Sequence, residues 1–469
     1  MTAEVDLVIR GGRVVNAGWS GQADVLIGSG RVVGVVEPGT LPAGAGNPNV
    51  VDAGGKLVLP GGVDPHCHVG FTSGDFTSLD DYRQATTAAL FGGTTTIVDF
   101  AIPRPGEQPA DAAARQQAKA PLGLCDAALH GCVVEWDPSV PGQLRDMVSS
   151  GIRTVKMYTT YRGETMANED TILRVMRTLA ELDAMVVIHC EANHIIELAQ
   201  SESAARQAIG AAGLPATRPE LAESASVAEV LAIAESVGAP VYFVHQSTPA
   251  VVDLVQEARA RGVRAWSESV THHLVLDEGK YDGENPERYV CCPPLRSPGT
   301  VAGLRRRLAM GQIDTVGSDH CCYDIAQKTV HAHDVRIMPN GLPGVETRLP
   351  VLFSEFVATG LITPERFVAV TSANPARLNG LYPRKGVIAA GSDADIIILD
   401  QEQPSTIDSA RLHMATDYTP YQGLPVRGRV DTVIVQGRPV IDDGVLIDPE
   451  PRGRSLAGNP LFAPARHAA

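Results

Sequence analysis

The chain has 469 residues, which is long for one hydrophobic core and short for three, so we expect one large domain and one small domain. With 44% hydrophobic and 20% charged residues, it has the composition of a soluble globular protein. The formal net charge of −15 argues against nucleic acid and anionic membranes as partners, because no basic block offsets it. A small neutral substrate fits this charge balance.

Signals for targeting and for disulfides are also weak. No apolar run reaches the roughly 18 residues that a membrane helix needs. The opening MTAEVDLVIR does not pair a basic start with an apolar stretch, as a secretory signal would. The eight cysteines form no C-x-x-C pair. We therefore expect a cytoplasmic protein with reduced thiols.

In chain order, the first predicted elements are short β-strands. VDLVIRGGRVVN and ADVLIGSGRVVGVV are β-branched runs interrupted by glycine, and GVIAAGSDADIIILD and RVDTVIVQGRPVI repeat this style near the other end. We expect residues 1–57 and 385–450 to form one small β-sandwich domain. Residues 451–469 are rich in Pro, Gly and Ala, and we expect a tail that contacts a neighbouring subunit or is disordered.

Residues 58–384 show a different pattern, in which apolar strand-like runs alternate with Ala-rich helical stretches. Eight such runs, each followed by helix-forming sequence, predict a (β/α)8 barrel, the TIM barrel. The alternative is a doubly wound open sheet, but no G-x-G-x-x-G follows the first strand. The runs are KLVLPGGVDPHCH, TTTIVDFA, AALHGCVV, TVKMY, AMVVIHCE, PVYFVHQS, RAWSESV and IDTVGSDH.

Metal-ligand residue types gather at the carboxyl ends of these predicted strands, which is the face where such barrels carry their active sites. On the first strand, His66 and His68 are two residues apart and so point the same way. Nitrogen and oxygen ligands of this kind suit zinc. One such residue would be a weak signal, but five of the eight strands contribute. The set is His66, His68, Lys156, His189, His245 and Asp319.

Lys156 is the unusual member of this set. A protonated amine has no lone pair and would repel a metal ion. The side chain could form a salt bridge to a carboxylate at the barrel rim. Alternatively, the amine could react with CO2 to give a carbamate that bridges two metals. The residues alone leave both interpretations open.

Several longer motifs are specific. GGVDPHCH, FGGTTTIVDF, KMYTTY, CCPPLR, VGSDH and PNGLPGVE resemble the hydantoinase/dihydropyrimidinase branch of the amidohydrolase superfamily. The resemblance extends over nearly the whole chain. The H-x-H and S-D-H motifs are shared across the superfamily, whereas PPLR and NGxPGxE indicate this branch.

The resemblance implies a metal-dependent hydrolase that opens dihydropyrimidine or 5-substituted hydantoin rings to N-carbamoyl amino acids. His66, His68 and Asp319 would hold one zinc ion, and His189 and His245 the other. A carboxylated Lys156 and a hydroxide would bridge the two ions, with the hydroxide as the nucleophile. Asp319 would act as general base and then as general acid.

The resemblance also implies how the substrate is held. Tyr161 would donate a hydrogen bond to the developing oxyanion. Backbone groups at Cys292 and Asn340 would bind the imide edge of the ring. This chain differs from many relatives at two positions: they have serine in place of Cys292, and aspartate is common in place of Thr347. These differences bear on which substrate is bound more than on the reaction. Homotetramers are common in this family.

Other histidines have structural interpretations. His331 and His333 repeat the H-x-H spacing, but they lie in a loop without further ligand types, and we expect a lid or surface segment. For His272 and His273, contact with substrate and a structural role remain open. His320 follows a ligand and could support it. Cys67 and Cys190 follow ligands on strands and should point away from the site.

Three rival functions remain. An allantoinase would use the same site on a related ring. A dihydroorotase typically has an arginine two residues after H-x-H, where this chain has Gly70. A non-catalytic scaffold of the collapsin-response-mediator type lacks the metal ligands, whereas all six ligand positions are filled here.

Overall fold

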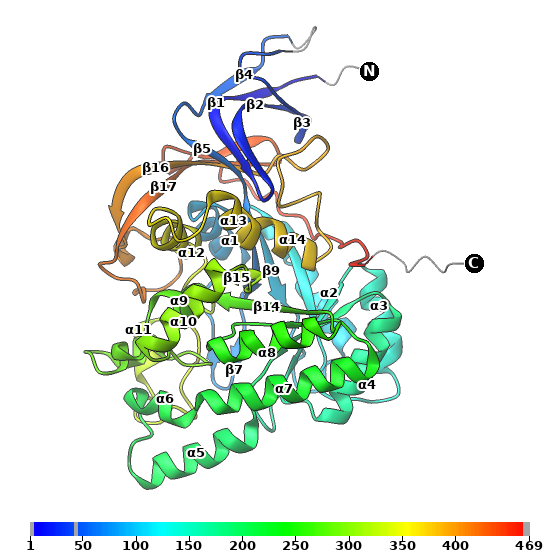
Figure 1. Cartoon of the computed structure of the whole chain (residues 1–469), viewed down its shortest axis with the longest axis vertical. Coiled ribbons are helices and arrows are strands. Elements are labelled where there is room, and N and C mark those ends of the chain that lie inside the picture. Colours follow the sequence, from blue (N-terminus) through cyan, green and yellow to red (C-terminus); the bar gives the residue numbers. More distant parts are fainter. Residues whose placement is uncertain (1–3, 42–45, 463–469) are drawn as a thin grey trace.

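The computed structural model describes residues 4–41 and 46–462 and consists of a barrel and a separate β-sheet (Figure 1). The eight barrel strands are all parallel, and β15 at one end of the hydrogen-bonded order contacts β6 at the other. A parallel bridge between Cys67 and His320 lies at this closing seam. The (β/α)8 prediction is therefore confirmed. The strands are β6 (Gly62–Cys67), β9 (Thr94–Phe100), β10 (Asp126–Cys132), β11 (Thr154–Tyr158), β12 (Met185–His189), β13 (Val241–Phe243), β14 (Ala265–Val270) and β15 (Thr315–Gly317).

Helices pack around the barrel, and α4 is an amphipathic example. In α4 the buried residues Ile172, Val175, Met176 and Leu179 recur at helical spacing, and the Asn168 side chain caps the first turn by accepting from the backbone N–H of Thr171. The longer helices are α1 (Tyr82–Phe91), α2 (Pro109–Gln117), α3 (Val140–Ser149), α4 (Glu169–Glu181), α5 (Asn193–Ala205), α7 (Glu220–Val237), α8 (Pro249–Ala260) and α10 (Pro298–Ala309). Shorter elements are α6 (Leu214–Thr217), α9 (Thr271–Val275), α11 (Ile325–Thr329), α12 (Arg348–Leu352), α13 (Pro364–Val368), α14 (Asn374–Leu378) and the hairpin β7 (Thr72–Ser73) with β8 (Phe76–Thr77).

The two chain ends meet in one nine-stranded sheet, as the sequence predicts. Strand β5 pairs with β1 on one side and antiparallel with β16 on the other, so the N-terminal and C-terminal segments share a ladder. The strands are β1 (Leu7–Asn16), β2 (Trp19–Gly28), β3 (Arg31–Val36), β4 (Asn49–Asp52), β5 (Leu57–Pro60), β16 (Ile396–Thr406), β17 (Pro425–Val435), β18 (Arg438–Asp442) and β19 (Val445–Leu446).

The run KLVLPGGVDPHCH forms two strands rather than one. Its first half, β5, belongs to the nine-stranded sheet, and its second half, β6, belongs to the barrel. Pro60 has no N–H to continue a ladder. A Cβ atom on Gly61 would lie 2.1 Å from the Thr95 hydroxyl oxygen, so only glycine allows the chain to pass this close to β9.

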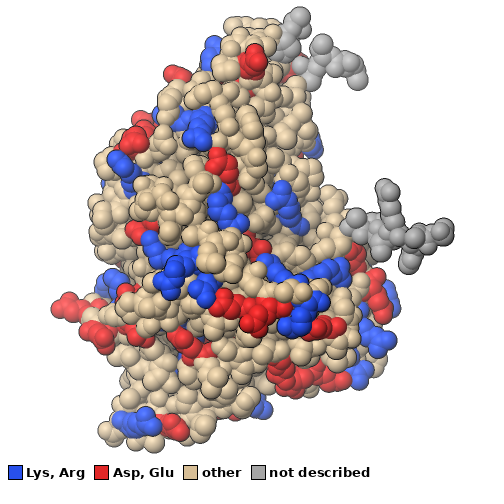
Figure 2. All heavy atoms as spheres, viewed as in Figure 1, with Lys and Arg blue, Asp and Glu red and all other residues tan. Residues whose placement is uncertain are grey.

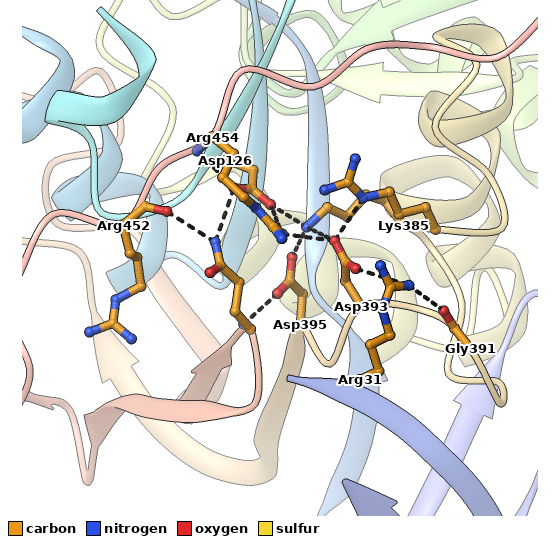
Figure 3. A network of polar contacts seen from close by, with 10 residues as sticks. Arg31, Asp126, Lys385, Gly391, Asp393, Asp395, Arg452 and Arg454 are labelled. Atoms are coloured by element: carbon orange, nitrogen blue, oxygen red, sulfur yellow. Dashed lines mark hydrogen bonds and ion pairs between the residues drawn. The ribbon is translucent and has the colours of Figure 1, made fainter. Parts of the chain in front are cut away.

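A buried polar network fastens the C-terminal segment to the barrel (Figure 3). The Lys385 amine lies 2.6 Å from an Asp126 carboxylate oxygen and 3.1 Å from an Asp393 oxygen, and Asp395 completes its partners. Arg454 forms ion pairs with Asp126 and Asp393 at 2.6 and 2.8 Å. Residues 451–462 of the predicted tail therefore pack on their own barrel. Residues 463–469 lie outside the described residues.

The molecular surface mixes both charge signs. On the face shown in Figure 2, basic and acidic side chains are interspersed. Within the described residues, no helix combines the length and apolar character needed to cross a bilayer. All eight cysteines lie in the described part of the chain, and each is buried with a free thiol.

Candidate functional site

Three predicted ligands meet where β6 and β15 end. The Nε2 atom of His66 lies 3.1 Å from Oδ1 of Asp319, and Nε2 of His68 lies 3.5 Å from the same oxygen. Burial would raise the pKa of Asp319, but the neighbouring imidazoles outweigh it and hold this pKa well below its usual range. A carboxylate between two imidazoles is a suitable arrangement for one divalent cation.

The other three predicted ligands lie beside this cluster. The ring centroids of His189 and His245 are 4.5 Å apart, and His245 lies 5.3 Å from His66. The Lys156 amine is 4.8 and 4.9 Å from the ring centroids of Phe100 and Tyr158. Burial lowers the pKa of Lys156 to about 8, although Asp319 and Glu268 attract its charge. An amine in this environment is readily neutral, and a neutral amine is the form that reacts with CO2.

Two buried glutamates that the sequence analysis did not single out orient these histidines. Oε1 of Glu268 is 2.7 Å from Nδ1 of His66, and Oε2 of Glu191 is 2.7 Å from Nε2 of His189. Each carboxylate accepts from one ring nitrogen and leaves the other free to bind a metal. Because strand side chains repeat every two residues, the spacing of His189 and Glu191 in AMVVIHCE could have suggested the second pair.

Arg218 connects His189 to Tyr161. Its guanidinium forms a buried ion pair with Glu191 and lies 5.0 Å from the centroid of the Tyr161 ring. The Tyr161 ring in turn packs edge-on against His189 at 5.5 Å. The predicted oxyanion donor is thus held against a predicted ligand by one arginine. Arg218 lies in the short loop between α6 and α7, away from the barrel strands whose ends were searched for site residues.

Three predicted site residues have strained backbones. Tyr161, His245 and Asp319 have φ angles of 69°, 39° and 50°, in the left-handed region that favours glycine. Each such residue costs of the order of 1–3 kcal/mol, and residues of this kind cluster at functional sites.

The predicted substrate-binding residues also converge. The Cys292 thiol donates a hydrogen bond to Oδ1 of Asn340 at 3.1 Å, and it lies close to the Tyr161 side chain. Burial raises the pKa of Cys292 to about 11, so this thiol is a neutral hydrogen-bonding group and not a nucleophile. The structure therefore brings Tyr161, Cys292 and Asn340 together.

Comparisons with known proteins agree with this geometry. Residues 57–440 match the model of the amidohydrolase family. A D-phenylhydantoinase of Escherichia coli is 35% identical over 98% of this chain and 99% of its own length. The chain belongs to the amidohydrolase family. Within that family it belongs to the hydantoinase/dihydropyrimidinase branch, as its motifs predict.

Solved structures of other amidohydrolases have the same fold along their full length. A dihydropyrimidinase from Brevibacillus agri superposes with a TM-score of 0.94 at 34% identity, covering 97% of this chain and 99% of that one. An L-hydantoinase from Arthrobacter aurescens gives 0.87 at 27% identity, covering 96% and 100%. The barrel and the sheet from the chain ends are thus shared with this branch.

Amidohydrolases generally use two metal ions, and the residues present here fit such a centre. One ligand atom each from His66, His68 and Asp319 lie within 4.8 Å of one another. Nε2 of His66, the ring nitrogen that faces Asp319, is buried and forms no hydrogen bond of suitable geometry among the described residues. An unpartnered buried ring nitrogen is costly unless something binds it.

Of the other histidines that the sequence analysis named, His273 and His320 have protein partners, whereas Nε2 of His272 is buried without a hydrogen-bond partner among the described residues. Nε2 of His273 donates to the Pro293 carbonyl at 3.0 Å. His320 pairs with Asp80 at 2.7 Å and accepts from the Gly344 backbone through its other nitrogen, so it braces the chain beside Asp319. Cys67 and Cys190 pack in hydrophobic clusters. After the end of α11, His331 is half-buried against Phe76 and His333 is exposed.

Proposed function

We propose that this amidohydrolase opens dihydropyrimidine or 5-substituted hydantoin rings by hydrolysis, giving N-carbamoyl amino acids. The observation that supports this most strongly is the convergence of four histidines, Asp319 and the buried Lys156 at one end of the barrel. The names of the related proteins support the class of ring.

We further propose that two zinc ions occupy this centre. His66, His68 and Asp319 would hold one, and His189 and His245 the other, with a carboxylated Lys156 between them. When bound, such ions lower the pKa of water to about 7 and polarise a carbonyl oxygen. The low pKa of Lys156 favours the neutral amine that carboxylation requires.

The side chains of this chain would perform the proton transfers and the binding. The Asp319 carboxylate is ionised and can accept a proton from the attacking water. It would return this proton to the ring nitrogen as the C–N bond breaks. The Tyr161 hydroxyl, whose pKa burial keeps well above its usual value, remains protonated and can donate to the developing oxyanion. Backbone groups at Cys292 and Asn340 would hold the imide edge.

Ring-opening assays of the zinc-loaded enzyme test this function. The panel holds dihydrouracil, both enantiomers of a 5-aryl hydantoin, allantoin and dihydroorotate. Activity on dihydrouracil or a hydantoin is the expected result and also gives the preferred enantiomer. Activity confined to allantoin would make the chain an allantoinase. Inactivity on all five with metals bound would contradict the proposed substrate class.

Three broader proposals concern organisation. We propose the domain boundaries 1–57 with 385–450, 58–384 and 451–469, with the remainder of β5 up to Pro60 counted with the sheet. We also propose a cytoplasmic location and a homotetramer. The homotetramer rests on the family resemblance, and the cytoplasmic location rests on the weak targeting signal and the free cysteines. Light scattering of the purified protein tests the tetramer, and limited proteolysis tests the boundaries.

A further inference from the structure

Two separate loops carry the predicted imide-binding residues, and a buried lysine lies between them. Cys292 lies in the segment between α9 and α10, two residues after Val290. Asn340 lies in the segment between α11 and α12, after β15. These loops are 48 residues apart in sequence, so their spacing is set by tertiary contacts alone. Lys328 of α11 is fully buried between the two loops, which Figure 1 shows in yellow-green.

Lys328 bonds to the backbone of both loops. Its amine donates to the carbonyl oxygen of Val290 at 2.7 Å and to that of Pro339 at 3.0 Å. Val290 lies two residues before Cys292, and Pro339 lies directly before Asn340. The Val290 oxygen also accepts from the Gly341 backbone N–H at 3.2 Å, so the loops are joined directly as well.

Burial of a lysine needs a reason, because taking the amine out of water is expensive. Among the described residues, Lys328 has no carboxylate as hydrogen-bond partner, and its partners are the two carbonyls. Burial lowers the pKa of Lys328 to about 8. Both the charged amine and the neutral amine carry at least two N–H donors, so both forms can bridge two carbonyl oxygens.

The neighbouring residue extends this linkage to a third loop. The Gln327 side chain donates to the Thr77 carbonyl at 3.0 Å, in the β7–β8 hairpin that follows the His66–His68 strand. Gln327 also forms a capping box with Asp324, which fixes the start of α11. Two consecutive residues of one short helix therefore contact three loops around the site.

We propose that Lys328 is a positioning residue that sets the spacing between the Cys292 loop and the Asn340 loop, and thereby the binding of the imide edge. The inference rests on the proposed function, because it concerns how that substrate is held. Lys328 touches neither the predicted metal ligands nor the reacting bond. Its loss should therefore weaken substrate binding more than it slows the chemical step.

The main experiment compares Lys328→Met with Lys280→Met, an exposed lysine on the neighbouring segment. Methionine keeps most of the aliphatic stem and removes both hydrogen bonds. We expect KM for the best ring substrate to rise by at least about tenfold in Lys328→Met, with kcat and metal content changed much less. Lys280→Met should match the wild type. An unchanged KM in a folded, metal-loaded Lys328→Met variant would overturn the proposal.

If Lys328→Met folds poorly, a second variant and a second measurement still test the proposal. Lys328→Gln keeps N–H donors on a shorter side chain, and its KM should lie between those of wild type and Lys328→Met. Hydrogen exchange followed by mass spectrometry needs no substrate. In the wild type, peptides covering residues 290–292 and 339–341 should open together, and both should exchange faster in either variant. Independent opening of the two peptides would refute the linkage.

The exchange experiment also separates this inference from the proposed function. If the wild type opens none of the rings in the panel, the proposed function fails. The prediction that the two loops exchange together would still be confirmed or contradicted by the exchange data, because that experiment needs no substrate.

Discussion

Glu268 holds His66 by a 2.7 Å contact between Oε1 and Nδ1, deep in the barrel. The same oxygen accepts the backbone N–H of His245 at 3.1 Å. The Glu268 carboxylate thus fixes the ring of His66, a ligand predicted for one ion. It also fixes the main chain of His245, a ligand predicted for the other ion. Both residues are fully buried, so water cannot substitute for this contact.

Glu268→Gln should weaken metal binding by about 10- to 100-fold, because the amide can present its N–H to His66 and reverse the ring tautomer. Competition with a chelator, followed by elemental analysis, measures this change. The matched control is Glu346→Gln, another buried glutamate bonded to a histidine, His413, at 2.9 Å but outside the site. Equal metal affinity in the two variants would remove Glu268 from metal binding.

Lys156→Ala should lose most of the activity, because the bridging group is removed. Short carboxylic acids should restore part of it, since their two oxygens can replace those of a carbamate. The assay is turnover with and without added propionate, together with metal content. Full activity of the untreated variant would rule out a carbamate on Lys156.

Tyr161→Phe should lower kcat by about 10²–10³-fold, because one preorganised oxyanion donor is lost while the ring packing against His189 remains. Tyr382→Phe, a half-buried tyrosine that stacks with Arg377, provides the control. An unchanged rate in Tyr161→Phe would assign the tyrosine a packing role only.

Local patterns in the sequence predicted the barrel strands and picked out the six candidate ligands, which the structure places at one end of the barrel. Apolar runs mark buried parallel strands, and strand ends share one face of the barrel. Arg218 and Lys328 could not be found in this way. Each bonds to residues on other loops, so its role depends on tertiary packing. The split between β5 and β6 was missed because apolar residues continue on both sides of Pro60 and Gly61, so the run resembles one strand.

Lys328 should make the stability of the protein depend on alkaline pH. Burial lowers its pKa to about 8 in the folded chain, against 10.5 for an ordinary lysine, although Cys291, Cys321 and Cys292 oppose this shift and Glu287 opposes it to a smaller extent. The folded state therefore releases the proton first, and stability should rise as pH increases from about 8 towards 10.5.

Between pH 7.5 and 9.5 the free energy of unfolding of the wild type should rise relative to that of Lys328→Met, by on the order of 2 kcal/mol. Urea unfolding of both proteins at the two pH values measures this difference. A constant difference would show that the lysine keeps its ordinary pKa when buried. A difference that shrinks at higher pH would show that its pKa is raised, and either result would contradict the expectation.

Lys385 should be among the most sensitive positions for stability outside the site. Burial alone would lower its pKa, but Asp395, Asp126 and Asp393 together raise it, so the amine stays charged among three buried or nearly buried carboxylates. Lys385→Met leaves those charges without their buried cation and should cost about 3–5 kcal/mol in the free energy of unfolding.

The matched control is the adjacent Arg384→Met. Arg384 contacts Asp393 at 3.0 Å but is one-third exposed, so its loss should cost no more than about 1 kcal/mol. Urea unfolding separates the two variants. Since Asp126 lies at the start of β10 and also binds Arg454, proteases should release the C-terminal segment faster from Lys385→Met than from Arg384→Met. Equal stability of the two variants would mean that Arg454 alone compensates the buried carboxylates.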